Sequence, residues 1–253
     1  MKVTNSYSYS IILSILLLIL WEIVVGFWHI SQQVLPSPTV VFSAFWDNIY
    51  ILIPHIGQTM LETIIGLALA VVLGVIVAVI LKFSAIVKKA IYPLLIVSQT
   101  IPIIALAPLL LIWFGFTIFP KVIIVTLCCF FPIAIAFADG MEKVNPQLIK
   151  LLQSMGASRI KILLLAEIPG ALPSFFSGLR IAAAYSVTGA IVGEYVGGYQ
   201  GLGVFMQTAA HSYAVALVFV VIIITSILSI LLFGLVSVLE YFFIPWHRKN
   251  KTS

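Results

Sequence analysis

The chain has 253 residues, of which 62% are hydrophobic and only 8% are charged, whereas an average soluble domain has roughly 25% charged residues. This composition excludes a water-soluble globular protein and predicts an all-α integral membrane protein. The formal net charge of +5 does not indicate nucleic-acid binding, because the positions of the basic residues follow a membrane topology instead.

Six apolar stretches are long enough to cross a bilayer, which takes about 20 residues of helix. They lie near 11–28, 60–81, 91–114, 120–138, 174–193 and 214–243. About six crossings in a single transmembrane domain, 1–253, are therefore the simplest interpretation. Every Lys and Arg except Lys121 falls on one side of this topology. Because basic residues are retained in the cytoplasm, both termini are predicted to be cytoplasmic.

The segment between the first two stretches begins with Leu35-Pro36-Ser37-Pro38, which predicts a rigid turn. Apolar residues then recur at helical spacing over 40–49, which is typical of a short helix in the outer interface, with a plain connecting loop as the alternative. Small residues recur at every fourth position of the second stretch, namely Gly66, Ala70, Gly74 and Ala78. Such a stripe favours close packing against another helix of the same chain.

The third stretch is interrupted by prolines, each of which removes a backbone hydrogen-bond donor. They are Pro93, Pro102 and Pro108. The polar residues Ser98, Gln99 and Thr100 come directly before the middle proline. Broken helices at membrane depth are tolerated only where they are buried in protein or line a cavity, so this stretch is a candidate wall of a substrate pathway. A kink whose freed carbonyls bond to Ser and Thr side chains is the alternative.

The interval 139–173 is the longest polar segment, and the topology places it in the cytoplasm. Asn145 can cap a helix whose first residue is Pro146, and Gly156 suits the left-handed conformation that ends such a helix. One apolar face of this helix is formed by Leu148, Leu151, Leu152 and Met155. A second helical segment begins near Ser158. The apolar face either rests on lipid headgroups or binds in a groove of a partner protein.

Four carboxylates lie in or near the apolar stretches. Glu22 and Glu62 are expected at the membrane interface, without an assigned role. Glu240 is expected either to form a local ion pair near Arg248 or to lie at a solvated helix end. Glu194 differs, because it ends the fifth stretch directly before a glycine-rich turn. We expect Glu194 to face substrate at the outer mouth, with a packing or gating contact as the alternative.

The segment 150–159 combines a helix, a glycine turn and a new helix start, and it continues through Ile168-Pro169 and Ala171-Leu172-Pro173. It resembles the cytoplasmic coupling motif of the inner-membrane permeases of binding-protein-dependent ABC importers, which have the type I fold. In that family the motif opens with Glu-Ala-Ala, whereas Lys150-Leu151-Leu152 stands here. The glycine and proline half is intact, and the resemblance extends from Leu35 to the last apolar stretch.

Three further motifs bear on the substrate. They are Ser98-Gln99-Thr100-Ile101-Pro102, Gly178-Leu179-Arg180-Ile181-Ala182 and Gly193-Glu194-Tyr195-Val196-Gly197. They look most like permeases for thiamine-precursor pyrimidines, within a branch that also includes sulfonate, taurine and nitrate permeases. The resemblance therefore implies such a pyrimidine, with sulfonate, taurine or nitrate as the alternative. An ion-driven secondary transporter, the rival from another class, is expected to show several buried ionisable groups or an internal repeat, and neither is evident.

The resemblance implies a permease in a bacterial inner membrane that imports a solute delivered by an extracytoplasmic solute-binding protein. Its other partners would be a second copy of the permease, two ATP-binding subunits and membrane lipid. The sequence has no Gly-x-x-x-x-Gly-Lys-Ser/Thr loop, so ATP and Mg²⁺ are expected on the ATPase, and no cofactor or enzymatic activity is expected in this chain. The adjacent Cys128 and Cys129 lack the spacing of metal ligands, so no metal site is expected.

The expected site residues form two sets, and none is expected to be catalytic. The set that couples to the ATPase is Leu148, Leu151, Leu152, Met155, Gly156, Ala157, Ser158 and Arg159. The set that lines the substrate pathway is Gln99, Thr100, Pro102, Tyr185, Ser186 and Glu194.

Overall fold

The computed structural model describes residues 3–245 and builds them almost entirely from helices, with no strand in that range. In chain order the helices are α1 (Val3–Phe27), α2 (Pro38–Phe83), α3 (Ala85–Ser98), α4 (Ile103–Phe114), α5 (Ile118–Glu142), α6 (Pro146–Ser154), α7 (Arg159–Ile162), the π-helical turn η1 (Leu163–Glu167), α8 (Ile168–Gly197), α9 (Leu202–His211) and α10 (Val215–Phe243). The all-α fold expected from the composition is confirmed.

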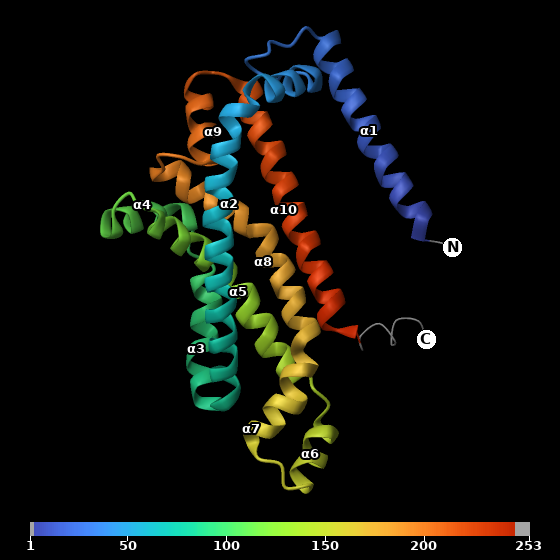
Figure 1. The fold of residues 1–253 in the computed structure, drawn as a ribbon, viewed down its shortest axis with the longest axis vertical. Helices are drawn as coiled ribbons and strands as arrows, with labels where there is room; N and C mark the ends of the chain where they lie inside the picture. The colour runs from blue at the N-terminus through green and yellow to red at the C-terminus, as the bar shows by residue number, and fades with distance from the viewer. Residues whose placement is uncertain (1–2, 246–253) are drawn as a thin grey trace.

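The core of the fold consists of α2, α5 and α8, with α10 packed against α8 and α2 (Figure 1). The stripe of small residues on α2 allows this close packing. A Cβ atom added to Gly66 would lie 2.5 Å from the side chain of Val125 on α5, and one added to Gly74 would lie 2.9 Å from that of Ile133. The expected packing within the chain is confirmed, and it provides the van der Waals fit that holds helices together in a membrane.

Four helical segments are long and apolar enough to cross a bilayer. They are Ile49–Phe83, Ile118–Glu142, Arg159–Gly197 and Val215–Phe243. Ile86–Ser98 and Ile103–Phe114 supply a fifth crossing if they count as one broken span, and Ile11–Phe27 is a shorter apolar helix. In the described part of the chain, the six predicted stretches thus correspond to four continuous helices, one broken pair and one shorter helix. Large apolar side chains are exposed along most of them, as a lipid-facing surface requires, whereas α5 exposes such side chains only at Ile118 and Phe119 in its first turn.

The third stretch is broken where its prolines predicted. The helix α3 ends at Ser98, α4 begins after Pro102, and the two helices are bent by 98°. The hydroxyls of Ser98 and Thr100 donate hydrogen bonds of 2.8 and 2.7 Å to carbonyls one turn earlier. The structure therefore contains both the predicted break and the alternative's hydrogen bonds from Ser and Thr side chains to nearby carbonyls.

The helix expected over 40–49 is the first part of α2, which runs without interruption for 46 residues. This part crosses the top of the molecule before α2 turns downward (Figure 1). Pro54 lies inside α2, where its missing N–H favours a bend. Glu22 of α1 accepts hydrogen bonds from the backbone N–H and the hydroxyl of Thr39, at 3.1 and 2.8 Å. These bonds attach the end of α1 to the start of α2.

The helix that contains the predicted span 174–193 begins much earlier, because it runs continuously over Arg159–Gly197. It passes Pro169 after the π-helical turn η1, in which the N–H of Ile168 bonds to the carbonyl of Leu163. This wider turn accommodates the proline, which would otherwise remove a donor and clash with the preceding turn.

The helices α6 and α7 lie at one end of the molecule, here termed the coupling end (Figure 1). The helix α9 and the loop between α1 and α2 lie toward the opposite end, here termed the far end. The helix α1 starts, and α10 finishes, on the side that faces the coupling end. The two ends of the described chain therefore point the same way, and their cytoplasmic location stays a prediction.

We expect Ser37→Cys to react with a membrane-impermeant maleimide added to intact cells, and Ser154→Cys to react only after permeabilisation. Ser37 precedes α2 at the far end, and Ser154 ends α6 at the coupling end, so the two positions test opposite faces. Cys128 and Cys129 are replaced by alanine in both variants. If only the Ser154 position were labelled in intact cells, the predicted topology would be wrong and the coupling end would face outward.

Candidate functional site

The start of α6 is set by its own sequence. The side chain of Asn145 accepts a 2.9 Å hydrogen bond from the N–H of Gln147. Pro146 occupies the first turn, where a missing N–H has no intrahelical partner to lose. The predicted cap is confirmed.

The turn after α6 depends on Gly156, whose φ of +78° lies in the left-handed region. The N–H of Ala157 donates a 3.0 Å hydrogen bond to the carbonyl of Leu152, which closes α6 with the pattern common at glycine-ended helices. Ser158 then caps α7 by accepting from the N–H of Lys161. The predicted sequence of helix, glycine turn and helix is confirmed.

The apolar stripe of α6 is open to its surroundings. Leu148, Leu151 and Met155 are 43%, 57% and 75% exposed, and Leu152 is half-buried. No residue of α6 is buried. An exposed apolar stripe on a rigidly ended helix is typical of a docking surface. Arg159, the last member of the predicted coupling set, instead donates hydrogen bonds to the end of α2.

Part of the predicted pathway set surrounds a cavity of about 360 Å³ between the α3–α4 break, α5 and α8, here termed the Gln99 pocket. Its walls are Ser98, Gln99, Ile101, Ile103, Leu106, Leu127, Cys128, Phe131, Pro132 and Tyr185. The structure therefore brings Gln99 and Tyr185 together from distant parts of the chain. Thr100 and Pro102 stand in the break beside this pocket without lining it.

The other two pathway candidates lie inside the protein. Ser186 is fully buried, and its hydroxyl donates a 2.8 Å hydrogen bond to the carbonyl of Ala183 in the same helix. Glu194 is also fully buried. Neither side chain lines an open path in this conformation, and their part in the pathway stays a prediction.

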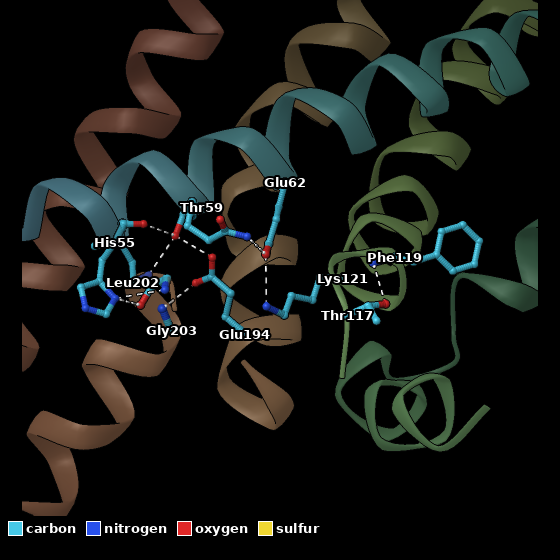
Figure 2. Close-up of polar contacts among 11 residues, drawn as sticks. His55, Thr59, Glu62, Thr117, Phe119, Lys121, Glu194, Leu202 and Gly203 are labelled. Carbon is cyan, nitrogen blue, oxygen red and sulfur yellow. Dashed lines mark hydrogen bonds and ion pairs between the residues drawn. The ribbon is translucent and has the colours of Figure 1, made fainter. Parts of the chain in front are cut away.

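Glu194 belongs to a group of polar side chains toward the far end, here termed the buried polar cluster. Its members are His55, Gln58, Thr59, Glu62, Lys121 and Glu194. Figure 2 shows that His55, Thr59 and Glu62 of α2, Lys121 of α5 and Glu194 of α8 reach toward one another. The carboxylate of Glu194 accepts hydrogen bonds of 2.7 Å from both the hydroxyl of Thr59 and the N–H of Gly203.

The start of α9 is capped by this cluster. The backbone N–H groups from Gly201 to Gly203 each find a side-chain acceptor, in order His55 at 3.0 Å, Thr59 at 2.9 Å and Glu194 at 2.7 Å. These N–H groups have no partner within their own helix, and a carboxylate is favoured at the positive end of the helix dipole. The cap thus comes from α2 and α8 rather than from the residues before α9.

The glycines of the turn are required by this close approach. A Cβ atom added to Gly201 would lie 2.1 Å from the carboxyl carbon of Glu194, and one added to Gly203 would lie 2.5 Å from the carbonyl oxygen of Ile191. Gly201 also has a φ of +133°, which side chains rarely adopt. The glycine-rich turn therefore wraps around Glu194.

Glu62 and Lys121 form a buried ion pair at 3.2 Å, and Gln58 donates a 2.8 Å hydrogen bond to the same carboxylate oxygen. Glu62 was expected at the membrane interface, and this is corrected because its side chain is fully buried between helices. Pairing is what makes the burial of both charges tolerable. The sequence did contain one signal of the buried polar cluster. The spacing of His55, Thr59 and Glu62 puts these three polar residues on one face of a helix.

Glu240 forms an ion pair with Arg180 of α8. The partner expected from the sequence was Arg248, which lies outside the described residues. Arg180 is therefore the partner of Glu240 in the described part of the chain, and the pair attaches the end of α10 to α8.

Comparison with known proteins identifies relatives that match most of the chain. The chain is 38% identical over 240 residues to the formylaminopyrimidine transport permease protein ThiX of Halalkalibacterium halodurans, which covers 93% of this chain and 94% of that protein. It is 29% identical to the taurine transport system permease protein TauC of Escherichia coli K12, over 91% of this chain and 86% of that protein.

An inward-facing structure of the MetNI methionine ABC transporter superposes with a TM-score of 0.69 at 20% identity, covering 78% of this chain and 98% of that chain. The fold is therefore that of a type I ABC importer permease, as the resemblance implied. Residues 70–243 match the family described as binding-protein-dependent transport system inner membrane component. The chain belongs to this family of ABC importer permeases.

Proposed function

We propose that this permease moves a thiamine-precursor pyrimidine across the bacterial inner membrane after an external solute-binding protein delivers it. Two copies of the chain would form the path, and two ATP-binding subunits would drive it from the cytoplasm. The observation that carries this proposal is the exposed apolar stripe of α6, which is held rigidly at both ends. Membership of the importer family supports the same assembly.

The stripe of α6 suits a groove on an ATPase subunit. The helix has nine residues and is therefore about 14 Å long, and its start and end are held by Asn145 and Gly156. Short amphipathic helices of this kind bind by burying their apolar face in a partner. Because the sequence lacks a phosphate-binding loop, the ATPase subunits supply ATP and Mg²⁺ and their closure moves the two permease copies. Contact with lipid headgroups is the competing use of the stripe.

The Gln99 pocket supports a small planar substrate. Its volume of about 360 Å³ falls in the range of about 300–1,000 Å³ typical of small-molecule sites. The amide of Gln99 can both donate and accept hydrogen bonds, while Tyr185 and Phe131 offer aromatic surface. An aminopyrimidine uses all of these groups, and ThiX, by its name, transports formylaminopyrimidine. Taurine, other sulfonates or nitrate form the second candidate class, which the similarity to TauC favours.

An ion-driven transporter would use buried ionisable side chains, and the buried polar cluster contains Glu62, Lys121 and Glu194. Each of them already has a structural task. Glu62 and Lys121 neutralise one another, and Glu194 caps α9. Together with the family match, these contacts favour the ATP-driven mechanism.

We expect Gly156→Leu to leave the permease inserted in the membrane but to weaken ATPase binding or uncouple hydrolysis from uptake several-fold. A leucine at φ +78° is strained by about 1–2 kcal/mol and would reorient α7. The measurements are ATPase pull-down and substrate-stimulated hydrolysis in reconstituted vesicles.

Gly156→Asn is the matched control, because asparagine tolerates the left-handed conformation better than leucine. It should retain most of the coupling. Normal association and normal coupled uptake in Gly156→Leu would show that this turn does not transmit the ATPase motion.

We expect Glu194→Gln to reduce uptake several-fold while the complex still assembles. Thr59→Ala removes a hydrogen-bond partner of Glu194 but keeps the carboxylate, and we expect each variant to lose stability by about 1 kcal/mol. Uptake and thermal unfolding are measured for both. Equal uptake losses would assign Glu194 to capping alone, whereas a loss confined to Glu194→Gln would support its pathway role.

We expect Tyr185→Ala and Gln99→Ala to raise the KM for formylaminopyrimidine at least three-fold, because each removes a contact from the pocket wall. Ile104→Ala is the control, since this exposed residue of α4 does not line the pocket. Competition by excess taurine tests the alternative substrate class. Unchanged KM values in both pocket variants would exclude the Gln99 pocket as a substrate contact.

A further inference from the structure

Arg159 stands in the first turn of α7 but binds across to α2. Its guanidinium donates hydrogen bonds of 3.1 Å to the carbonyls of both Lys82 and Phe83, the last two residues of α2. It also lies over the ring of Phe83, 5.6 Å from the ring centre. The last carbonyls of a helix have no intrahelical partners and carry partial negative charge, so a guanidinium there forms strong, charge-assisted hydrogen bonds.

A second contact fastens the other end of the same segment. Glu167, the last residue of η1, is buried and pairs with the ammonium of Lys82 at 3.0 Å. Lys82 also donates a 3.1 Å hydrogen bond to the carbonyl of Met141 near the end of α5. The segment 159–167 is thus attached to the last turn of α2 at both its ends. We term these contacts of Arg159, Glu167, Lys82 and Phe83 the α2 clasp.

Residues 145–167 are here termed the coupling segment. The α2 clasp attaches this segment to α2 through polar contacts. It borders a hollow of about 470 Å³ that Gln153 of α6 also lines, and no residue of α6 is buried against the membrane helices. Motion of α6 can therefore reach the core along the backbone on both sides, through residues 143–145 to α5 and through Gly156 to α7. From the clasp, α2 runs without interruption to the buried polar cluster.

We propose that Arg159, supported by Glu167, is a positioning residue that holds the coupling segment on α2, so that displacement of α6 by an ATPase moves α2 with it. Arg159 acts through α2 and is not itself an ATPase contact. This inference rests on the proposed function, because it assumes that an ATPase displaces α6.

The test follows α2 directly and does not depend on the identity of the substrate. A spin label replaces Tyr50, an exposed residue in the first part of α2, in chains with Cys128→Ala and Cys129→Ala. Distances between the labels of two copies are measured in the full importer complex, with its binding protein, before and after trapping with ATP and vanadate. Arg159→Ala should keep ATPase co-purification and basal hydrolysis within two-fold but lose at least half of the label shift.

Three variants separate positioning from a general loss of structure. Lys161→Ala removes the same charge from an exposed site of α7. In this variant the distance between the labels should change as much as in the unmodified chain. Arg159→Lys keeps a donor for the helix end and should restore part of the shift. Glu167→Gln keeps the size of the side chain but removes the ion pair with Lys82, and it should give a smaller loss than Arg159→Ala.

Several results would overturn the inference. They are a full shift in Arg159→Ala, no shift in the unmodified complex, equal losses in Lys161→Ala, and loss of ATPase binding in Arg159→Ala, which would make Arg159 an ATPase contact. Failure of the proposed function looks different, because the unmodified permease would then bind no ATPase at all.

Discussion

The helix α9 begins inside the protein, where its first backbone N–H groups have no access to water. In a membrane such groups must find partners within the protein, because each unsatisfied one costs several kcal/mol. His55 and Thr59 reach them from α2, and Glu194 reaches them from α8. This requirement explains why a carboxylate lies buried at the end of α8 and why the turn around it is rich in glycine. It also locks α2, α8 and α9 together.

The helix α2 takes part in the buried polar cluster, in the packed core and in the contacts at the coupling end. Toward the far end it supplies the hydrogen-bond acceptors His55, Thr59 and Glu62 of the buried polar cluster. The ion pair of Glu62 with Lys121 extends that cluster to α5. In the middle, its small residues bring it into close contact with α5. At the coupling end, Arg159 binds its last carbonyls. One uninterrupted helix therefore connects the surface where force would be applied with the cluster that holds the core together.

The coupling segment could be predicted from the sequence because its determinants act locally. Asn145 caps the helix that follows it, and Gly156 ends that helix through its own backbone conformation. The ion pair of Glu62 with Lys121 could not be predicted in this way, since its partners are 59 residues apart and meet only when α2 packs on α5. Arg159 is a similar case, because its membership of the coupling motif gives no indication of acceptors 77 and 76 residues away.

The same distinction between local and long-range structure applies to the breaks in the helices. The interruption near Pro102 was predictable because the polar residues Ser98 and Thr100 supply the replacement hydrogen bonds themselves. The continuation of the helix past Pro169 was not predictable, because a π-helical turn accommodates the proline at that point. Proline therefore marks a possible break, and the surrounding structure decides whether the helix continues.

Among the ion pairs of the described residues, the pair in the buried polar cluster is the least exposed. The side chains of Arg180 and Glu240 are 27% and 19% exposed. The side chains of Lys88 and Glu142 are 30% and 48% exposed, those of Lys82 and Glu167 are 22% and 10% exposed, and those of Lys121 and Glu62 are 6% and 0% exposed. Exposed pairs contribute about 0–1 kcal/mol, whereas breaking a buried pair costs about 3–5 kcal/mol. The pair of Lys88 with Glu142 can therefore re-form in a new geometry at little cost, while the pair of Lys82 with Glu167 in the α2 clasp and the buried polar cluster resist change. Displacement applied at α6 would then move α2 as a unit instead of separating it from α5 and α9.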